Sequence, residues 1–302
     1  MGKLLVTGSI GIDTVITPTG RADEVLGGSA VYFAMAASLF GPVRLVGVVG
    51  EDFPDQFRTV FDGREVDLAG LEVRKGSKTF RWTGEYAADM NDRQTLNVEL
   101  NVLDERGPTI PESFHDSQYV FLANTHPVLQ RDLLAQVSKP KLAVCDTMDL
   151  WIETEREELL KTLAAVHGVV LNDSEALLLT GQRDLVRAGR WVLEHGPNFV
   201  VIKKGQHGCV LVAGEQIFVL PAYPTIDVLD PTGAGDAFAG GMMGYLASVD
   251  LFSPRELKAA IAHGTITASI VIEGFSLDAL QGTDRPCFLQ RLETFVEMLR
   301  FD

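Results

Sequence analysis

The stretch Asp230-Pro-Thr-Gly-Ala-Gly-Asp-Ala-Phe-Ala-Gly-Gly241 is the most informative part of the chain. Its first four residues have the composition of a turn, and Gly233 and Gly235 let the backbone pass close to a ligand. A helix is predicted to begin at Ala234, and the free N–H groups of a first helical turn, aided by the helix dipole, bind anions. Asp236 lies in this same turn, where the dipole favours its ionised form.

A carboxylate beside an anion hole suits the transfer of a phosphoryl group to a hydroxyl. The amides of Gly233, Ala234 and Gly235 would stabilise charge on the migrating phosphate, and Asp236 would accept the hydroxyl proton. The alternative interpretation is a turn followed by a capped helix that binds no ligand. The remainder of the chain helps to decide between the two.

Short apolar runs alternate with amphipathic segments, which is typical of an α/β fold. Several runs are apolar on both faces, as in a buried parallel sheet. We therefore expect one doubly wound domain over residues 1–302, with a mostly parallel sheet flanked by helices. The expected strands are Lys3–Gly8, Arg44–Val49, Tyr119–Ala123, Lys141–Cys145, Gly168–Leu171, Phe199–Ile202, Cys209–Val212 and Ile217–Leu220. The expected helices are Ala30–Phe40, Val128–Val137, Glu153–Ala165, Asp173–Leu179, Leu185–Glu194, Ala234–Ala247, Pro254–Val271 and Arg285–Leu299.

Two segments do not fit the buried-sheet pattern. In Thr95–Val102 leucine and valine alternate with polar residues, and Thr79–Tyr86 places Phe80 and Trp82 on one face. Such alternation indicates strands with one apolar and one polar face. We expect a small β lid over a pocket, with segments near 12–24 and 78–104, although an ordinary edge hairpin would show the same pattern. An exposed apolar face on this lid would suit a homodimer.

The composition restricts the classes of partner. Asp and Glu outnumber Lys and Arg by 41 to 26, and the resulting net charge of −15 argues against nucleic-acid binding. The N-terminal apolar run is too short for a signal peptide, and no stretch reaches membrane-spanning length. We therefore expect a cytoplasmic protein that binds no membrane. The motifs of P-loop enzymes, protein kinases and dinucleotide-binding dehydrogenases are absent from the sequence.

The segment around Asp236 resembles the C-terminal signature D-T-x-G-A-G-D of the PfkB, or ribokinase-like, carbohydrate kinases, with Pro231 in place of the usual threonine. In that family the last aspartate is the catalytic base and the G-A-G amides form the anion hole. The resemblance implies a kinase that uses ATP and Mg²⁺ to phosphorylate a hydroxyl of a small sugar or sugar-like molecule. It extends over roughly 270 residues, because other short motifs follow in the family's order.

On the acceptor side, Asp13 matches the aspartate with which the family binds substrate hydroxyls. Gly27 and Gly28, followed by a helix of small residues, resemble the family's double-glycine signature, which faces the sugar. Tyr32 departs from this signature, since many members have an asparagine at that position. A tyrosine offers a ring face and one hydroxyl in place of an amide, so we expect Tyr32 to influence which acceptor is chosen.

On the nucleotide side, Asn172 and Glu175 match the family's N-x-x-E motif, which organises Mg²⁺ and the phosphates largely through water. Lys203, Gly205 and Gly208 match its K-x-G-x-x-G turn. Asn172 and Lys203 each follow an apolar run, and ligands of open α/β sheets bind at the carboxyl ends of strands. A helix cap with a solvated glutamate would give the same N-x-x-E spacing.

The resemblance also implies a nucleotide contact at Thr232 and at His263, and a monovalent cation such as K⁺ near Asp230 and Thr232. A histidine that is simply packed on its helix is the alternative for His263. Within the family, a nucleoside kinase is the second interpretation of the whole chain. From a different class, a non-catalytic sensor of sugars or nucleotides would keep the fold, but such a sensor would have no need for the base Asp236.

Overall fold

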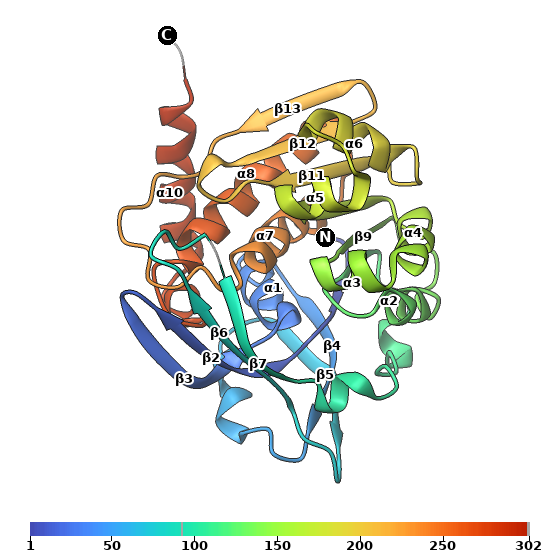
Figure 1. Cartoon of the computed structure of the whole chain (residues 1–302), viewed down its shortest axis with the longest axis vertical. Helices are drawn as coiled ribbons and strands as arrows, with labels where there is room; N and C mark the ends of the chain where they lie inside the picture. The colour runs from blue at the N-terminus through green and yellow to red at the C-terminus, as the bar shows by residue number, and fades with distance from the viewer. Residues whose placement is uncertain (92, 301–302) are drawn as a thin grey trace.

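The structure is a computed structural model in which residues 1–91 and 93–300 are described. Strands of this part form a large sheet of order β13-β12-β11-β10-β9-β8-β1-β4-β5 and a separate small sheet (Figure 1). In the large sheet β12 runs antiparallel to both neighbours, and the other neighbouring pairs are parallel. Its strands are β1 Leu4–Thr7, β4 Val43–Gly50, β5 Val66–Arg74, β8 Tyr119–Leu122, β9 Leu142–Asp146, β10 Gly168–Asn172, β11 Phe199–Lys203, β12 Cys209–Ala213 and β13 Gln216–Leu220.

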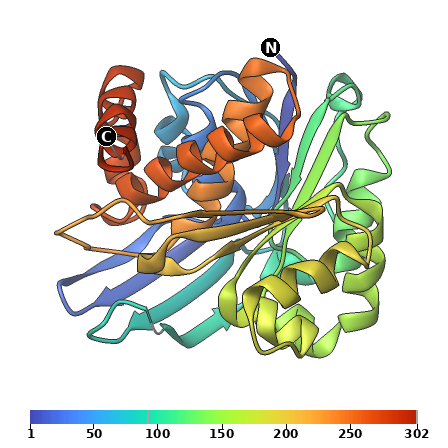
Figure 2. The same ribbon diagram turned by 90° about the horizontal axis from the view of Figure 1, so that it is seen from above.

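Helices cover both faces of the large sheet (Figure 2). Adjacent strand residues such as Val120 and Phe121 belong to cores on opposite faces, and both are fully buried. This explains why the strand runs are apolar throughout, and it confirms the expected α/β fold with a mostly parallel sheet. On one face lie α1 Ser29–Ala37, α7 Ala234–Val249, α8 Pro254–Val271, α9 Asp278–Gln281 and α10 Arg285–Met298. On the other lie α2 Pro127–Leu134, α3 Asp149–Thr154, α4 Arg156–Ala165, α5 Asp173–Thr180 and α6 Leu185–Leu193.

Two predictions about the large sheet and its helices were wrong. Strand β5 was not expected, because Asp67 and Gly70 interrupt its apolar pattern; the strand lies at the edge of the sheet, where its β4 partner shows a register shift. The expected helix Glu153–Ala165 is two helices, since the backbone leaves the helical region at Glu155 (φ −129°). In the described part of the chain, no helix has both the length and the apolar character needed to cross a membrane.

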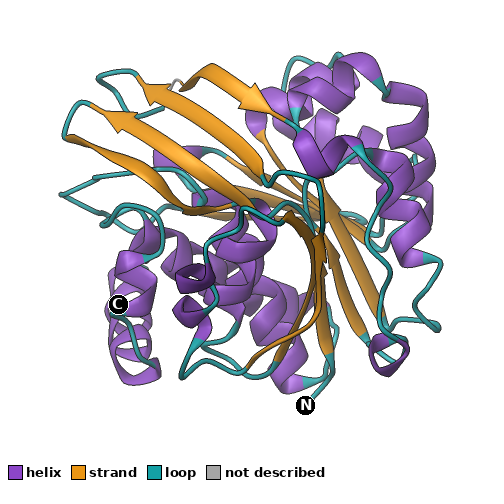
Figure 3. Cartoon of the chain, turned by 90° about the horizontal axis from the view of Figure 1, so that it is seen from below, coloured by secondary structure: helices purple, strands orange, loops and turns teal. Residues whose placement is uncertain are grey.

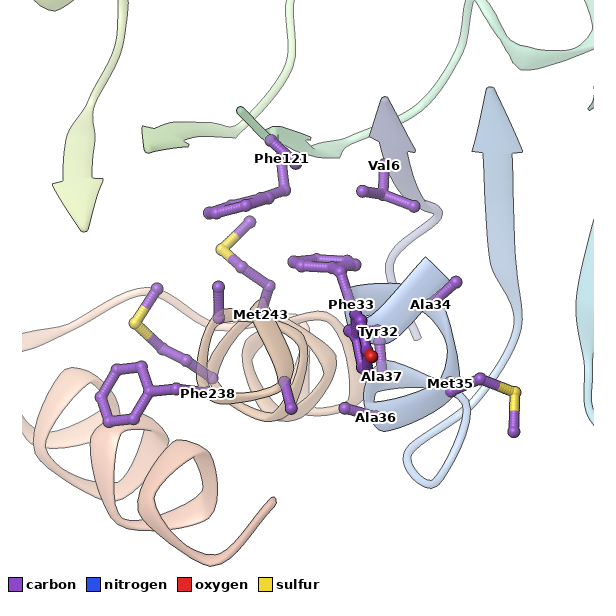
Figure 4. Packing of buried hydrophobic residues seen from close by; sticks show 14 of the residues in the cluster. Val6, Tyr32, Phe33, Ala34, Met35, Ala36, Ala37, Phe121, Phe238 and Met243 are labelled. Atoms are coloured by element: carbon purple, nitrogen blue, oxygen red, sulfur yellow. The ribbon is translucent and has the colours of Figure 1, made fainter. Parts of the chain in front are cut away.

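Helices α1 and α7 pack with their backbones in close contact (Figure 4). A Cβ atom at Gly240 would lie 2.4 Å from the carbonyl oxygen of Phe33, and one at Gly244 would lie 3.0 Å from Cα of Ala37. The small residues of α7 are therefore required by this approach. On the other side of α1, the Phe33 ring stacks on Phe121 of β8 at a centroid distance of 4.6 Å.

The small sheet has the order β3-β2-β6-β7 and lacks a helical layer of its own (Figure 3). Its strands are β2 Gly11–Thr17, β3 Gly20–Gly27, β6 Phe80–Tyr86 and β7 Arg93–Glu99. The expected strand Thr95–Val102 ends earlier, because Leu100 is helical (φ −63°, ψ −42°) and a 3₁₀ helix, Asn101–Asp104, follows. Val98 is half exposed, and the homodimer expected at this sheet stays a prediction.

A short turn attaches the small sheet to the large one. Asp52, which lies two residues after the end of β4, accepts a hydrogen bond from the Thr79 backbone N–H at 2.6 Å. The Thr79 hydroxyl in turn accepts one from the Gly50 N–H at 3.1 Å. These bonds determine where β6 leaves the body of the protein, and therefore where the small sheet stands relative to the strand ends.

Candidate active site

A cleft of about 1430 Å³ lies between the carboxyl ends of the parallel strands and the small sheet. Most residues predicted for the site line it together, although they come from distant parts of the sequence. These residues are Asp13, Gly28, Tyr32, Asn172, Glu175, Lys203, Gly205, Gly208, Thr232, Gly233, Ala234, Gly235 and Asp236. A cleft at the carboxyl edge of an open α/β sheet is the usual place for a ligand in such folds.

The turn that precedes α7 has the geometry expected of an anion hole. Gly233 is the N-cap residue of α7 and adopts the left-handed region (φ 76°), which a glycine tolerates without strain. The Asp230 carboxylate accepts a hydrogen bond from the Thr232 N–H at 2.8 Å and so shapes the turn. The Ala234 N–H donates to the Pro231 carbonyl oxygen at 3.2 Å. The N–H groups of Gly235 and Asp236 have no acceptor one turn earlier in their own helix, and both residues line the cleft.

Asp236 lies within this first turn, beside a cation. A Cβ atom at Gly235 would lie 2.5 Å from Nζ of Lys203, so the end of the lysine side chain reaches the backbone of this turn. Burial raises the pKa of Asp236 to about 6, and the positive charge of Lys203 opposes the rise. A carboxyl with a pKa near 6 is ionised at neutral pH and is basic enough to accept a proton.

The acceptor side of the cleft contains polar atoms without a protein partner. Oδ1 of Asp13 and the hydroxyl of Tyr32 are buried and make no hydrogen bond to the described residues. Burial, followed by the charges of Asp230 and Asp236, raises the pKa of Asp13 to about 7. Gly27 lies directly behind this carboxylate, because a Cβ atom there would lie 1.9 Å from Asp13 Oδ2. Unpaired buried polar atoms of this kind are expected where a ligand binds.

The N-x-x-E motif forms a capping box at the start of α5. Oδ1 of Asn172 accepts from the Glu175 N–H at 2.8 Å and from the Ser174 hydroxyl at 2.7 Å. Oε2 of Glu175 accepts from the Asn172 N–H at 2.7 Å, which leaves its other oxygen for the cleft. Asn172 and Glu175 therefore cap the helix, as the alternative interpretation expects, and they also line the cleft.

The turn after β11 requires glycine at two positions. Gly205 and Gly208 both have positive φ (52° and 82°), and a Cβ atom at Gly208 would lie 2.0 Å from the carbonyl oxygen of Leu220. The Lys204 N–H donates to the Gly208 carbonyl at 2.7 Å and closes the turn. This compact turn leaves its backbone open to a ligand on the Lys203 side of the cleft.

Comparison with known proteins explains why these motifs occur in this order. Residues 1–281 match the model of the pfkB family carbohydrate kinases. The chain belongs to the pfkB family. It is similar to the cytidine kinase of Thermococcus kodakarensis, with 34% identity over 253 residues that cover 81% of this chain and 89% of that protein. The fructokinase of Klebsiella pneumoniae is 31% identical over 262 residues, which are 82% of this chain and 85% of that protein.

The fold agrees with a solved pfkB-type structure. The ribokinase of Cryptococcus neoformans var. grubii, solved in complex with ADP, superposes with a TM-score of 0.78 at 21% sequence identity. The match covers 96% of this chain and 100% of that one. The ribokinase-like fold expected from the sequence is therefore confirmed, and the chain is a kinase of the family that includes sugar and nucleoside kinases.

Two predicted site residues do not line the cleft: Gly27, which lies behind Asp13, and His263. His263 is not among the described residues that line the cleft; its imidazole stacks on Tyr245 at 4.1 Å between ring centroids and on Phe288 at 5.7 Å. Its Nδ1 lies 2.8 Å from the carbonyl oxygen of Ala259. This histidine therefore packs on other rings outside the cleft, whereas Thr265 and Ala268 of the same helix line the cleft.

Asp146 and Arg93 are charged cleft residues that the sequence analysis did not identify. Asp146 ends β9 in the run LAVCD, where it follows an apolar strand as Asn172 and Lys203 do, so the same signal could have identified it. Burial and the charge of Asp236 raise its pKa well above the usual range. Arg93 begins β7, two residues before the strand Thr95–Val102 expected from the sequence, so it was not recognised as part of the small sheet.

The raised pKa of Asp236 predicts that its ionised carboxylate lowers the stability of the folded protein. A carboxyl whose pKa is raised by folding opposes folding once it ionises, so this cost is absent well below pH 4 and complete above about pH 6. In Asp236→Asn a neutral amide replaces the carboxylate, so this cost in stability is removed. We expect this variant to be more stable than the wild type at pH 8, by on the order of 2 kcal/mol, in urea unfolding.

The stabilisation should shrink as the pH approaches 4. Asp132→Asn, on the exposed side of α2, is the matched control and should change stability little at either pH. Equal stability of Asp236→Asn and the wild type at pH 8 would show that burial does not penalise the Asp236 carboxylate.

Proposed function

We propose that this chain is an ATP-dependent kinase that transfers the γ-phosphoryl group of ATP to a hydroxyl of a small sugar-like acceptor, with Asp236 as general base. The observation that carries the proposal is the meeting of Asp236, the first-turn amides of α7 and Nζ of Lys203 in one cleft. Membership of the pfkB family supports it, as does the ADP in the structure of the Cryptococcus ribokinase.

In the proposed reaction, the acceptor hydroxyl gives its proton to Asp236 while its oxygen forms a bond to the γ-phosphorus. The bond between the γ-phosphorus and the bridging oxygen breaks, and ADP leaves with that electron pair. The amides of Gly233, Ala234 and Gly235 and the ammonium of Lys203 stabilise negative charge on the oxygens of the migrating group. No covalent enzyme intermediate is needed, so catalysis rests on positioning and electrostatics.

Mg²⁺ suits the donor set on the nucleotide side, because this ion prefers oxygen ligands and retains several waters. One oxygen of Glu175 remains available, and Oδ1 of Asp146 is buried with no partner among the described residues. Asn172 Oδ1 already accepts two hydrogen bonds, so we propose that Asn172 acts by orienting Glu175. Bound through Glu175, Asp146 and water, Mg²⁺ would neutralise charge on the β- and γ-phosphates.

The acceptor is proposed to bind in the part of the cleft lined by Asp13 of β2 and Tyr32 of α1, where its hydroxyls would pair with Asp13 Oδ1 and the Tyr32 hydroxyl. A nucleoside is the second candidate, favoured by the 34% identity to a cytidine kinase. Trp82 of β6 also supports it, since its indole lies across Gly84 and lines the cleft. Stacking of a base on an aromatic side chain is worth about 1–3 kcal/mol.

An assay of ATP-to-ADP conversion over a panel of sugars, polyols and nucleosides, with Mg²⁺ present, tests the proposal. We expect turnover with at least one of these acceptors and a phosphorylated product by mass spectrometry. Turnover with nucleosides alone would select the second candidate. Acceptor binding without turnover across the panel would contradict the kinase proposal and favour a sensor.

We further propose that Arg93 supplies a second cation to the migrating phosphoryl group. Arg93 pairs with Tyr86 across the small sheet, and the Thr232 hydroxyl donates to the Tyr86 hydroxyl at 3.1 Å, so this end of the sheet stands over the anion hole. The Arg93 guanidinium lies 5.4 Å from the centroid of Trp82. Burial raises the pKa of Asp236, and the positive charge of Arg93 is among the influences that oppose this rise.

Removing this charge should slow phosphoryl transfer more than it weakens acceptor binding. We expect Arg93→Gln to lower kcat by about 10²-fold, the typical effect of losing one group that stabilises developing charge. Steady-state kinetics with the acceptor found in the panel measure this, and Arg21→Ala, an exposed arginine of the same sheet, is the control. A change confined to the acceptor KM would instead assign Arg93 to acceptor binding.

A further inference from the structure

The Tyr32 side chain reaches both the turn before α7 and the acceptor pocket. The shorter asparagine that many family members have at this position would not reach both. Its ring lies against the turn before α7: a Cβ atom at Gly233 would lie 2.3 Å from Cγ and Cδ1 of Tyr32 and 2.5 Å from Cδ2. Gly233 is held in the left-handed region (φ 76°), and the ring closes one side of it. Figure 4 shows Tyr32 between α1 and α7, whereas the next residue, Phe33, turns toward Phe121.

The far end of the same side chain belongs to the acceptor pocket. Tyr32 is 1% exposed, it lines the cleft, and its hydroxyl makes no hydrogen bond to the described residues. Burial, followed by the charges of Asp13 and Asp230, raises the pKa of Tyr32 well above its usual range, so the hydroxyl keeps its proton and can donate it. A hydroxyl or carbonyl oxygen of an acceptor could accept a hydrogen bond from this Tyr32 hydroxyl.

We propose that Tyr32 couples acceptor binding to the geometry of the anion hole, an inference that rests on the proposed kinase function. Its hydroxyl binds the acceptor, and its ring acts as a positioning group that holds the Gly233 backbone. A hydrogen bond to the acceptor restrains the ring, and the ring restrains the turn whose amides face the phosphoryl group. An asparagine at this position would bind an acceptor without filling the space beside Gly233.

Two variants separate the roles of the hydroxyl and the ring. Tyr32→Phe keeps the ring and should raise the acceptor KM by roughly three- to tenfold, with kcat nearly unchanged. Tyr32→Leu removes the ring as well and should also lower kcat by about 10- to 100-fold, because small misplacements of a catalytic group are costly. The KM for ATP should change little in Tyr32→Phe. Equal kcat values in the two variants would overturn the positioning role.

Amide hydrogen exchange tests the ring's role without any assay of activity. Residues 233–237 should exchange faster in Tyr32→Leu than in the wild type, and at the wild-type rate in Tyr32→Phe. Phe33→Leu is the control, since Phe33 is equally buried on the same helix but stacks on Phe121. It should destabilise the core while leaving exchange at 233–237 close to that of the wild type.

The two measurements keep this inference distinct from the proposed function. If the wild type phosphorylates no acceptor but Tyr32→Leu still loosens residues 233–237, the kinase proposal fails and the positioning role stands. If the wild type is active but exchange at 233–237 is the same in Tyr32→Leu and Tyr32→Phe, the kinase proposal stands and the positioning role is wrong.

Discussion

The close packing of α1 against α7 is the constraint on which the rest of the site depends. The two helices touch at Gly240 and Gly244, where added Cβ atoms would lie 2.4 Å from the Phe33 carbonyl oxygen and 3.0 Å from Cα of Ala37. Tyr32 lies beside Gly233, and Ala37 lies beside Gly244, so α1 and α7 run in the same direction along their contact. Their N-termini therefore meet, and this brings the acceptor pocket next to the anion hole. A larger side chain along the contact would push the two apart.

The charges of the cleft conflict with the stability of the fold. Burial raises the pKa of Asp13, Asp146 and Asp236, which shows that each carboxylate is less favourable in this place than in water. The positive charges of Lys203, at the end of β11, and of Arg93, on the small sheet, oppose the rise in the pKa of Asp236. Such an arrangement is typical of a site retained for function at a cost in stability.

Much of this could be predicted from the sequence, because its strongest signals are local. The run DPTGAGD predicts a turn, an anion hole and a base within seven residues, and buried parallel strands are recognisable as apolar runs. The β5 strand was missed since edge strands tolerate residues such as Asp67 and Gly70, which weaken the pattern. Arg93 lies before the alternating residues that identify this strand, and its pairing with Tyr86 of β6 becomes visible only in the folded chain.

His263 and Tyr32 show the limits of a family pattern. His263 occupies a position implied for the nucleotide, but its ring packs against those of Tyr245 and Phe288. Tyr32 was expected only to line the acceptor pocket, and nothing in the sequence indicates that its ring lies against Gly233. Contacts between residues two hundred positions apart require the folded chain.

The central claim, that Asp236 accepts the proton of the acceptor hydroxyl, is tested most directly by the turnover of Asp236→Asn. This change preserves the size of the side chain and removes its basicity. With the acceptor identified by the panel, we predict a fall in kcat of at least about 10²-fold, since positioned general bases typically contribute 10²–10⁴-fold, together with an ATP affinity close to that of the wild type. Wild-type turnover in the purified, folded variant would contradict the account.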